Sequence, residues 1–561
     1  MLLAFLLVAL VGCGPTPQSS KSNGPAETPA GRPSQPLVIA VKAEPVSITT
    51  RVLGQPGTGL RTFRTLFNAF IAQRDDSGSW QPYLVDPLPV LNTDTWRVFP
   101  DGRMETTYRL RPGLAWHDGT ALAAEDFVFS WRVYLAPEYG FASAPPFSAI
   151  DEVLAIDDQS FAIGWNRPYP AAADLSVLND ELPPLPRHML RQSFEELPPD
   201  GFARISFWTR EYVGLGPYRL DRWEPGAFLE ATAFDGYVLG RPKIDRLRLV
   251  FIADSNAALA NVLAREVHVA DTAVGIEQVE VLEREWGNSG KILIDAGASW
   301  RLTFFQLRPE LANPLAILDP RVRKALAHAV DKQAMNEVAQ RGYGIRANSM
   351  IAPLSEFGRA AERGAVDYAF DPRRSEQLME EAGFRKGADG YYASAARFSA
   401  SLQTGFTPYS ERELLIHAAG WRTAGFDIQE SVIPAAQAQD AQLGASFPGM
   451  LTRTTYGGLT TMVDFTSTGI PRAENRWRGV NRGGWSNPEY DRLVAAFNST
   501  LDQSQRAEQI TQTIRIYTDE LPAIPLYFFG SVFAYVSALQ GPQQVPVDTD
   551  QLWNVHRWQF Q

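Results

Sequence analysis

The chain has 561 residues and a formal net charge of −11 at pH 7. This length exceeds what one hydrophobic core supports, so we expect roughly two to four domains. Hydrophobic residues make up 45% and charged residues 20% of the chain, a balance typical of folded globular proteins. The acidic balance argues against a nucleic-acid partner, because phosphate binding requires a basic face.

The chain begins with an apolar run that ends at its single cysteine, Cys13. The run is shorter than the about 20 residues of a membrane-spanning helix and predicts a signal peptide over 1–13. Leu10-Val11-Gly12-Cys13 resembles the bacterial lipobox, so we expect lipidation of Cys13; the alternative is a free buried thiol. No Lys or Arg precedes the run, which leaves open a start codon upstream. Residues 14–36, rich in Pro, Ser, Gly and Thr, predict a flexible linker.

Regular patterns begin after this linker. A short β-branched run predicts a first strand over 37–41. Apolar residues at helical spacing predict a helix over 61–71. Short strands are expected at 96–98 and 106–110.

The stretch 111–131 gathers a histidine, carboxylates and tryptophans, which raises the question of catalysis. His117 lies at an Asp-Gly turn, and apolar spacing beyond it predicts a helix over 124–135. Glu125 and Asp126 then lie in the first turn, where carboxylates favour the helix dipole. Consecutive helical residues point about 100° apart, so these two cannot face one reacting bond. We interpret the stretch as a strand, a turn and an amphipathic helix.

The second half of the chain alternates strand and helix signals. Asp319 suits an N-cap and Pro320 the first helical position. A strand at 398–402, a helix at 410–423 and a strand at 427–433 predict a β-α-β unit. Alternation predicts a further strand at 244–252, and further helices are expected to begin at 371 and 487.

Several of these segments resemble, in the same order, elements of the family 5 extracellular solute-binding proteins, the dipeptide and oligopeptide receptors of ABC importers. The first, from Leu110 to Trp131, resembles "LRxGxxWxDGxxxxAxDVxxSW", although Ala123 stands where the family often has Thr or Ser. The others resemble "GTGPYxxxxWxPG" from Gly214, "NPDYWxGKP" from Phe234, "DxRVRxAxxxAIDR" from Asp319, "NPEYDxL" from Asn487 and "PxIPLYxxxxxYA" from Leu521. A dinucleotide loop at Gly214 is not favoured, because Arg219 occupies the third glycine position and no helix follows.

The resemblance implies an α/β fold with two lobes, the periplasmic-binding-protein fold of type II, similar to cluster C. It implies a first lobe over 37–299 with an inserted subdomain at about 80–205, a second lobe over 300–520, and a return to the first lobe over 521–561. The chain would cross twice between the lobes and form a two-segment hinge. A ligand that contacts both lobes favours closure only by its higher affinity for the closed form.

An enzyme is the rival class, and the sequence offers little support for one. It contains neither a G-x-S-x-G nor an H-E-x-x-H motif, and its six histidines are dispersed. The stretch from Gly287 to Lys291 has the wrong spacing for a phosphate loop, and Ile292 stands where Ser or Thr would hold magnesium. We therefore expect no catalytic residues, no metal and no cofactor; a secreted hydrolase with dispersed carboxylates stays the weaker alternative.

The identity of the ligand is left open by the residues. Peptide-binding members of the family carry an aspartate that pairs with the peptide ammonium in a "WxxDYxxP"-like stretch. The corresponding stretch here, 453–458, has neither that Asp nor that Pro, although Asp464 lies downstream and is a substitute. A buried ammonium without a carboxylate is costly. A peptide is the first expectation, and an oligosaccharide or an opine is the alternative.

Positions that match the family's cleft are the expected ligand contacts, although a structural role is an equally good interpretation of each. They are Glu44, Val46, Ser47, Trp300, Arg301, Arg453, Tyr456, Gly457 and Trp485. Arg453 carries the sharpest hypothesis, a bidentate bond to a ligand carboxylate.

The expected function is that of a substrate-binding lipoprotein, a monomer that delivers its solute to an ABC permease and ATPase complex. Its expected location is the cell envelope, at the periplasmic or extracellular face, with a lipid anchor in the membrane. A sensor or chaperone with the same fold is a second hypothesis.

Overall fold

The computed structural model describes residues 35–51, 53, 60–142, 144–175, 181–405, 410–437 and 440–561. The chain forms two units, Met1–Gln35 and Pro36–Gln561, and the second holds every helix and strand named below. The predicted signal peptide, Cys13 and nearly all of the predicted linker lie outside the described residues. Among the described residues, no helix is long and apolar enough to cross a membrane.

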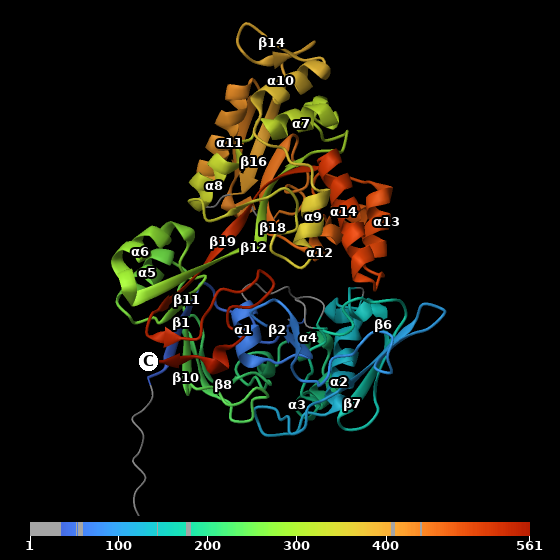
Figure 1. Ribbon diagram of the computed structural model, residues 1–561, viewed down its shortest axis with the longest axis vertical. Helices are drawn as coiled ribbons and strands as arrows, with labels where there is room; N and C mark the ends of the chain where they lie inside the picture. The colour runs from blue at the N-terminus through green and yellow to red at the C-terminus, as the bar shows by residue number, and fades with distance from the viewer. Residues whose placement is uncertain are drawn as a thin grey trace, which may run out of the picture. The chain divides into compact units, whose positions relative to one another are not determined.

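A sheet of 11 strands runs through the second unit (Figure 1). Its order is β17-β16-β18-β12-β19-β11-β1-β10-β9-β8, and β13 pairs with β19 beside this path. The strands are β1 (Leu37–Val41), β8 (Tyr218–Glu224), β9 (Phe228–Ala233), β10 (Arg246–Phe251), β11 (Val269–Asp271), β12 (Gly290–Phe305), β13 (Ile345–Arg346), β16 (Ser399–Gly405), β17 (Asp427–Ile433), β18 (Met450–Tyr456) and β19 (Ala523–Val536).

Two long antiparallel strands, β12 and β19, connect the two halves of this sheet. We call the half around β1 and β8–β11 the first lobe and the half around β16–β18 the second lobe. The β12–β19 ladder is regular from Gly290↔Val536 to Ala296↔Gly530 and resumes at Trp300↔Phe528. The interruption at 297–299 therefore lies where the strands pass from one lobe to the other.

Each lobe buries side chains on both faces of its half of the sheet. In β1, Leu37, Ile39 and Val41 join one core cluster and Ala40 joins another. In β12, Trp300 and Leu302 pack on one face of the second lobe and Phe305 on the other. This alternation follows from the two-residue repeat of a strand, and the buried faces require helices as covers.

Helices cover the sheet and connect its parallel strands, as β16 and β17 are connected by α11. The α-helices are α1 (Leu60–Phe67), α2 (Ala124–Leu135), α3 (Arg187–Glu196), α4 (Pro199–Phe202), α5 (Ser255–Leu263), α6 (Val279–Trp286), α7 (Pro320–His328), α8 (Lys332–Gln340), α9 (Gly358–Gly364), α10 (Pro372–Glu381), α11 (Ser410–Ala424), α12 (Leu459–Asp464), α13 (Pro488–Phe497) and α14 (Gln503–Glu520).

A separate four-stranded antiparallel sheet lies inside the segment 80–205, with the order β4-β5-β7-β6. Its strands are β4 (Trp96–Val98), β5 (Met104–Arg109), β6 (Ile150–Ala155) and β7 (Ser160–Trp165). Two-stranded sheets are formed by β2 (Ala72–Arg74) with β3 (Trp80–Pro82), β14 (Arg385–Lys386) with β15 (Tyr392–Ala393), and β20 (Leu539–Gln540) with β21 (Gln559–Phe560).

Elements with a strong local pattern are confirmed. The strands β1, β4 and β17 and the helix α2 have the expected bounds, and Asp319 caps α7 with Pro320 at its first position. The helix expected over 61–71 ends earlier, at Phe67. Its carbonyl accepts the N–H of Gly216 at 3.0 Å instead of the N–H four residues ahead. A Cβ on Gly216 would lie 2.4 Å from the Phe67 carbonyl carbon, so this contact requires glycine.

Candidate functional site

The ionisable cluster at 117–126 in the first lobe has partners for its groups inside the protein. The N–H of Gly214 donates to Nδ1 of buried His117 at 3.1 Å, so Nε2, 3.0 Å from the Gly216 carbonyl, carries the proton. Burial lowers the pKa of His117 to about 4. Asp126 accepts N–H groups from Ala123, Arg187 and Trp116. These bonds join a turn to α2 and leave His117 and Asp126 without a free acid–base role, while Asp118 pairs with His188 at 2.7 Å on the partly exposed side of the turn.

The loop after β1 holds three of the predicted contacts. Glu44 is half-buried and accepts the indole N–H of Trp223 at 2.7 Å and the N–H of Gly226 at 2.9 Å. The buried hydroxyl of Ser47 donates to the carbonyl of Trp208 at 2.5 Å. Val46 is 55% exposed. Of the three, only Val46 leaves its side chain open to a ligand.

Trp300 and Arg301 lie in β12 just beyond the interruption, and both are buried. The indole N–H of Trp300 donates to the carbonyl of Tyr456 at 3.0 Å. Arg301 Nε donates to Glu413 at 2.7 Å, and Glu413 also accepts the hydroxyl of Tyr527 at 2.6 Å. These bonds give Trp300 and Arg301 a structural role, and a direct ligand contact by either stays a prediction.

Trp485 and Gly457 also have structural partners. Trp485 is 4% exposed, and its indole N–H donates to Glu520 at 2.6 Å. A Cβ on Gly457 would lie 3.0 Å from the Gly297 carbonyl and 3.1 Å from the Phe528 ring. Gly457 therefore permits close packing at the crossing between the lobes.

Arg453 and Tyr456 lie in β18, and their side chains take little part in bonding within the protein. Tyr456 is 68% exposed, although its carbonyl accepts bonds from Trp300 and from the Thr461 hydroxyl. Arg453 is half-buried and belongs to none of the ion pairs among the described residues. Burial, and then the charge of Arg301, lowers the pKa of Arg453. Both residues are available to a ligand.

Two further ionisable side chains lie in the second lobe without a partner of opposite charge among the described residues. Burial raises the pKa of Asp464, at the end of α12, to about 6. Arg482 lies beside Arg453, which the sequence analysis missed. Nothing in the sequence around Arg482 indicates this neighbour, because the contact depends on how β18 and the loop before α13 approach each other.

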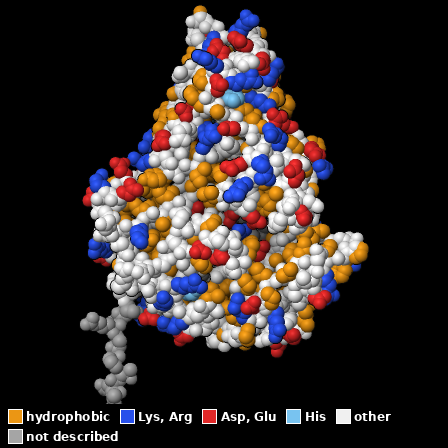
Figure 2. All heavy atoms as spheres, viewed as in Figure 1, with side chains coloured by type: hydrophobic (Ala, Val, Ile, Leu, Met, Phe, Trp, Pro, Cys, Tyr) orange, Lys and Arg blue, Asp and Glu red, His pale blue; other side chains and the backbone are white. Residues whose placement is uncertain are grey.

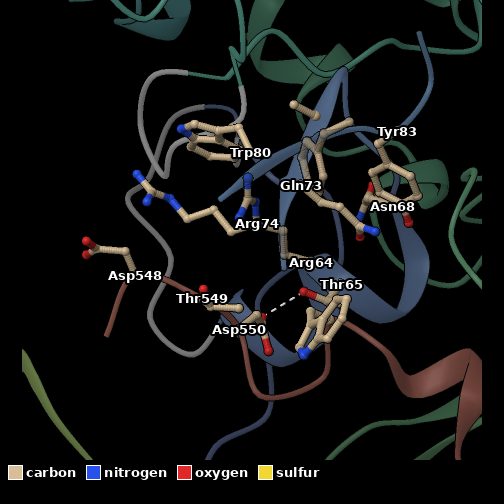
Figure 3. Close-up of a pocket in the computed structure, with 13 residues that line it drawn as sticks. Arg64, Thr65, Asn68, Gln73, Arg74, Trp80, Tyr83, Asp548, Thr549 and Asp550 are labelled. Carbon is tan, nitrogen blue, oxygen red and sulfur yellow. Dashed lines mark hydrogen bonds between the residues drawn. The ribbon is translucent and has the colours of Figure 1, made fainter. Parts of the chain in front are cut away.

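A small pocket of about 60 Å³ opens on the first lobe. Its wall includes Arg64, Arg74, Trp80, Asp550 and Trp553 (Figure 3). Thr65, from α1, donates its hydroxyl to Asp550 at 2.7 Å, which joins α1 to the C-terminal segment. The guanidinium of Arg74 lies 4.4 Å from the centre of the Trp80 ring.

Arg74 also links this pocket to the other lobe. Its Nη2 atom lies 2.9 Å from Oε2 of Glu356, which precedes α9 in the second lobe. The space-filling view shows a recess between the two lobes with charged side chains inside it (Figure 2). Among the described residues there is no cluster of His, Cys, Asp and Glu that could hold a metal ion.

Comparison with known proteins shows which family has a similar sequence. The sequence model described as "Bacterial extracellular solute-binding proteins, family 5 Middle" matches residues 86–469. The oligopeptide-binding protein AppA of Bacillus subtilis is 22% identical over 566 residues, covering 100% of this chain and 98% of AppA. The dipeptide-binding protein of Escherichia coli is 24% identical over 460 residues, covering 77% of this chain and 79% of that protein.

Solved structures share the fold. NikZ of Campylobacter jejuni, in complex with Ni(L-His), has a TM-score of 0.72 and 22% identity, covering 94% of this chain and 100% of NikZ. AppA of B. subtilis, in complex with a nonapeptide, has a TM-score of 0.68 and 20% identity, covering 94% of this chain and 99% of AppA.

The fold defines a two-lobed α/β solute-binding protein, and this class is distinct from enzymes. The chain belongs to the family 5 bacterial extracellular solute-binding proteins. The expected family and fold class are thereby confirmed.

Proposed function

We propose that this chain binds a peptide between its two lobes and delivers it to the permease of an ABC importer. The relatives AppA and the dipeptide-binding protein, named for peptides, support a peptide as ligand. The observation that carries the proposal is the pair of uncompensated charges in the second lobe. Arg453 suits a carboxylate and Asp464 suits an ammonium, and a peptide has one of each at its ends.

The lobes are proposed to divide the chain at 37–299 and 521–561 for the first and 300–520 for the second. The interruption of the β12–β19 ladder at 297–299 supports the boundary after residue 299. On β19 the same interruption lies between Phe528 and Gly530, which favours a return to the first lobe later than residue 521. Val46 from the first lobe and Tyr456 from the second offer exposed apolar surface to one ligand. The ion pair between Arg74 and Glu356 then favours the closed arrangement.

Mass spectrometry of whatever co-purifies with the chain tests the ligand class directly. A thermal-shift screen of peptides and oligosaccharides complements it, because a ligand at a hundredfold excess over its Kd stabilises the protein by about 2.7 kcal/mol. Recovery of intact peptides supports the proposal. Stabilisation by oligosaccharides alone, or conversion of the ligand to a product, contradicts it.

Lipidation of Cys13, anchoring to the membrane at the outer face of the cell and a monomeric state belong to the same proposal. A lipid anchor on a linker keeps the solute-binding unit near its permease. Radiolabelled palmitate should enter the wild-type chain, and Cys13→Ala should release the protein to the soluble fraction. A Cys13→Ala chain that stays in the membrane fraction contradicts the anchor.

A further inference from the structure

Two guanidinium groups lie side by side in the second lobe. A Cβ built on Gly444 would lie 2.7 Å from Nη1 of Arg482 and 3.1 Å from Nη1 of Arg453. Arg453 comes from β18 and Arg482 from the loop before α13, so the fold brings together two distant parts of the chain. Gly444 has no side chain to separate them.

Neither arginine has a carboxylate partner among the described residues. Nη1 of Arg482 is shielded from solvent and makes no hydrogen bond. The charges that act on the two groups come from arginines, Arg301 on Arg453 and Arg453 on Arg482. Asp440, whose carbonyl lies 3.4 Å from the Cβ built on Gly444, accepts the N–H of Leu443 with its carboxylate at 2.9 Å.

Other buried or half-buried arginines of the second lobe have an ion pair, carbonyl acceptors or aromatic rings beside them, as Arg506 has the rings of Phe357 and Phe497. Arg301 pairs with Glu413, and Arg422 pairs with Glu430. Arg323 donates to four backbone carbonyls. The pair at Gly444 departs from this rule, and like charges held out of water raise the free energy of the empty protein. A bound anion would remove that penalty.

The pair is partly accessible from solvent. β16, β17 and β18 are parallel, and β18 ends at Tyr456, beside the crossing between the lobes. Arg453 is the central residue of β18, and Gly444 and Arg482 lie towards the amino end of that strand, where the N–H of Leu307 donates to the Gly483 carbonyl at 2.8 Å. Both arginine side chains are only half-buried, so an anion from solvent can reach them.

We propose that Arg453 and Arg482 form one subsite for a group with two negative charges. With a peptide as ligand, which rests on the proposed function, that group is a terminal carboxylate together with an acidic side chain on the last residue. One carboxylate would compensate one arginine only. The subsite therefore selects peptides that end in Glu or Asp over their Gln or Asn counterparts.

Calorimetry on the full chain with matched peptides that end in Glu, in Gln, and in Glu with an amidated terminus tests the selection. A charged hydrogen bond predicts about tenfold tighter binding of the Glu peptide than of the Gln peptide. Amidation of the terminus should weaken binding to a similar extent. Arg482→Gln should remove most of the Glu preference. Arg478→Gln, an exposed arginine nearby without an ion pair among the described residues, is the matched control.

Equal binding of the Glu and Gln peptides by the wild type, or an unchanged preference in a folded Arg482→Gln chain, overturns the proposal. Arg482→Lys keeps the charge and should retain part of the preference, which guards against a purely structural effect.

A thermal-shift series with succinate and with inorganic phosphate separates this proposal from the proposed function. If no peptide binds but either dianion stabilises the wild type and not Arg482→Gln, the subsite stands and the peptide function fails. If peptides bind without a Glu preference, only the subsite fails. If neither peptides nor dianions bind, both proposals are overturned.

Discussion

Two clusters of ionisable side chains, one in each lobe, differ in how the protein treats them. Around His117 and Asp126 in the first lobe, the ring nitrogens and carboxylate oxygens have partners within the fold. In the second lobe, the neighbouring Arg453 and Arg482, and separately Asp464, have no partner of opposite charge among the described residues. In the sequence, the first-lobe residues look more like a catalytic site. In the structure, however, it is the second-lobe residues that are left without partners and can bind a ligand. Polar groups whose partners lie within the protein stabilise the fold, whereas buried groups without such partners are candidates for ligand binding.

The buried ion pair of Arg301 and Glu413 gives the largest expected effect on the structural side of this comparison. Arg301→Ala leaves Glu413 buried without its cation and should lower the free energy of unfolding by about 3–5 kcal/mol. The double variant Arg301→Met with Glu413→Leu should recover most of that loss. Urea titration measures both variants. A loss below about 1 kcal/mol in Arg301→Ala would contradict the structural role.

His117 should make the first lobe sensitive to acid. The pKa of His117 is about 4 in the folded chain and 6.5 without the burial. As the pH falls, the unfolded chain is therefore protonated at His117 before the folded chain is. The stability that neutral His117 provides is therefore present above pH 6.5 and is lost as the pH falls towards 4, by about 3 kcal/mol in all. The stability difference between wild type and His117→Gln should shrink over this window. A difference independent of pH would reject the assignment.

Arg453 tests the ligand side of the comparison. Arg453→Ala should weaken binding of the co-purified ligand by about 1.5–3 kcal/mol, the range for a charged hydrogen bond. The stability of the empty protein should not fall, because Arg453 has no ion pair to lose among the described residues. Calorimetry and thermal unfolding give the two quantities. Unchanged affinity with an intact fold would reject the role.

Asp464 gives the smallest expected effect. Its substitution should raise the free energy of unfolding and lower the affinity for peptides. Its pKa is raised from 3.8 to about 6, so its charge costs stability as the pH rises through this window. Asp464→Asn should raise the free energy of unfolding by about 1–2 kcal/mol at pH 7, allowing for partial exposure.

The same Asp464→Asn variant should bind peptides with a free amino terminus more weakly and N-acetylated peptides as before. Parallel losses of stability and of affinity would show that Asp464 supports the fold instead of the ligand.

Local patterns predicted the fold well where they were strong. The strand β1 and the helix α2 follow from residue spacing alone, and the N-cap at Asp319 follows from residue type. The early end of α1 could not be predicted, since it depends on Gly216 taking the Phe67 carbonyl.

The candidate site was less accessible to sequence reasoning. Trp300, Arg301 and Trp485 occupy positions that match a cleft, but their bonds to Tyr456, Glu413 and Glu520 become visible only in three dimensions. The neighbour of Arg453 was missed for the same reason. Residue type and spacing do not reveal whether a charge is compensated by a distant part of the chain.

The short interruption between β12 and β19 sets the direction in which the lobes can move. Sliding one lobe along these strands would break a whole ladder of backbone hydrogen bonds at once, whereas bending at 297–299 breaks none of the paired bonds on either side. The φ angle of Gly297, 144°, is one that a side chain would oppose. We expect bending to concentrate in this irregular stretch of β12, which includes a second register shift between Arg301 and Leu302, and ligand uptake and release would then depend on the same few residues.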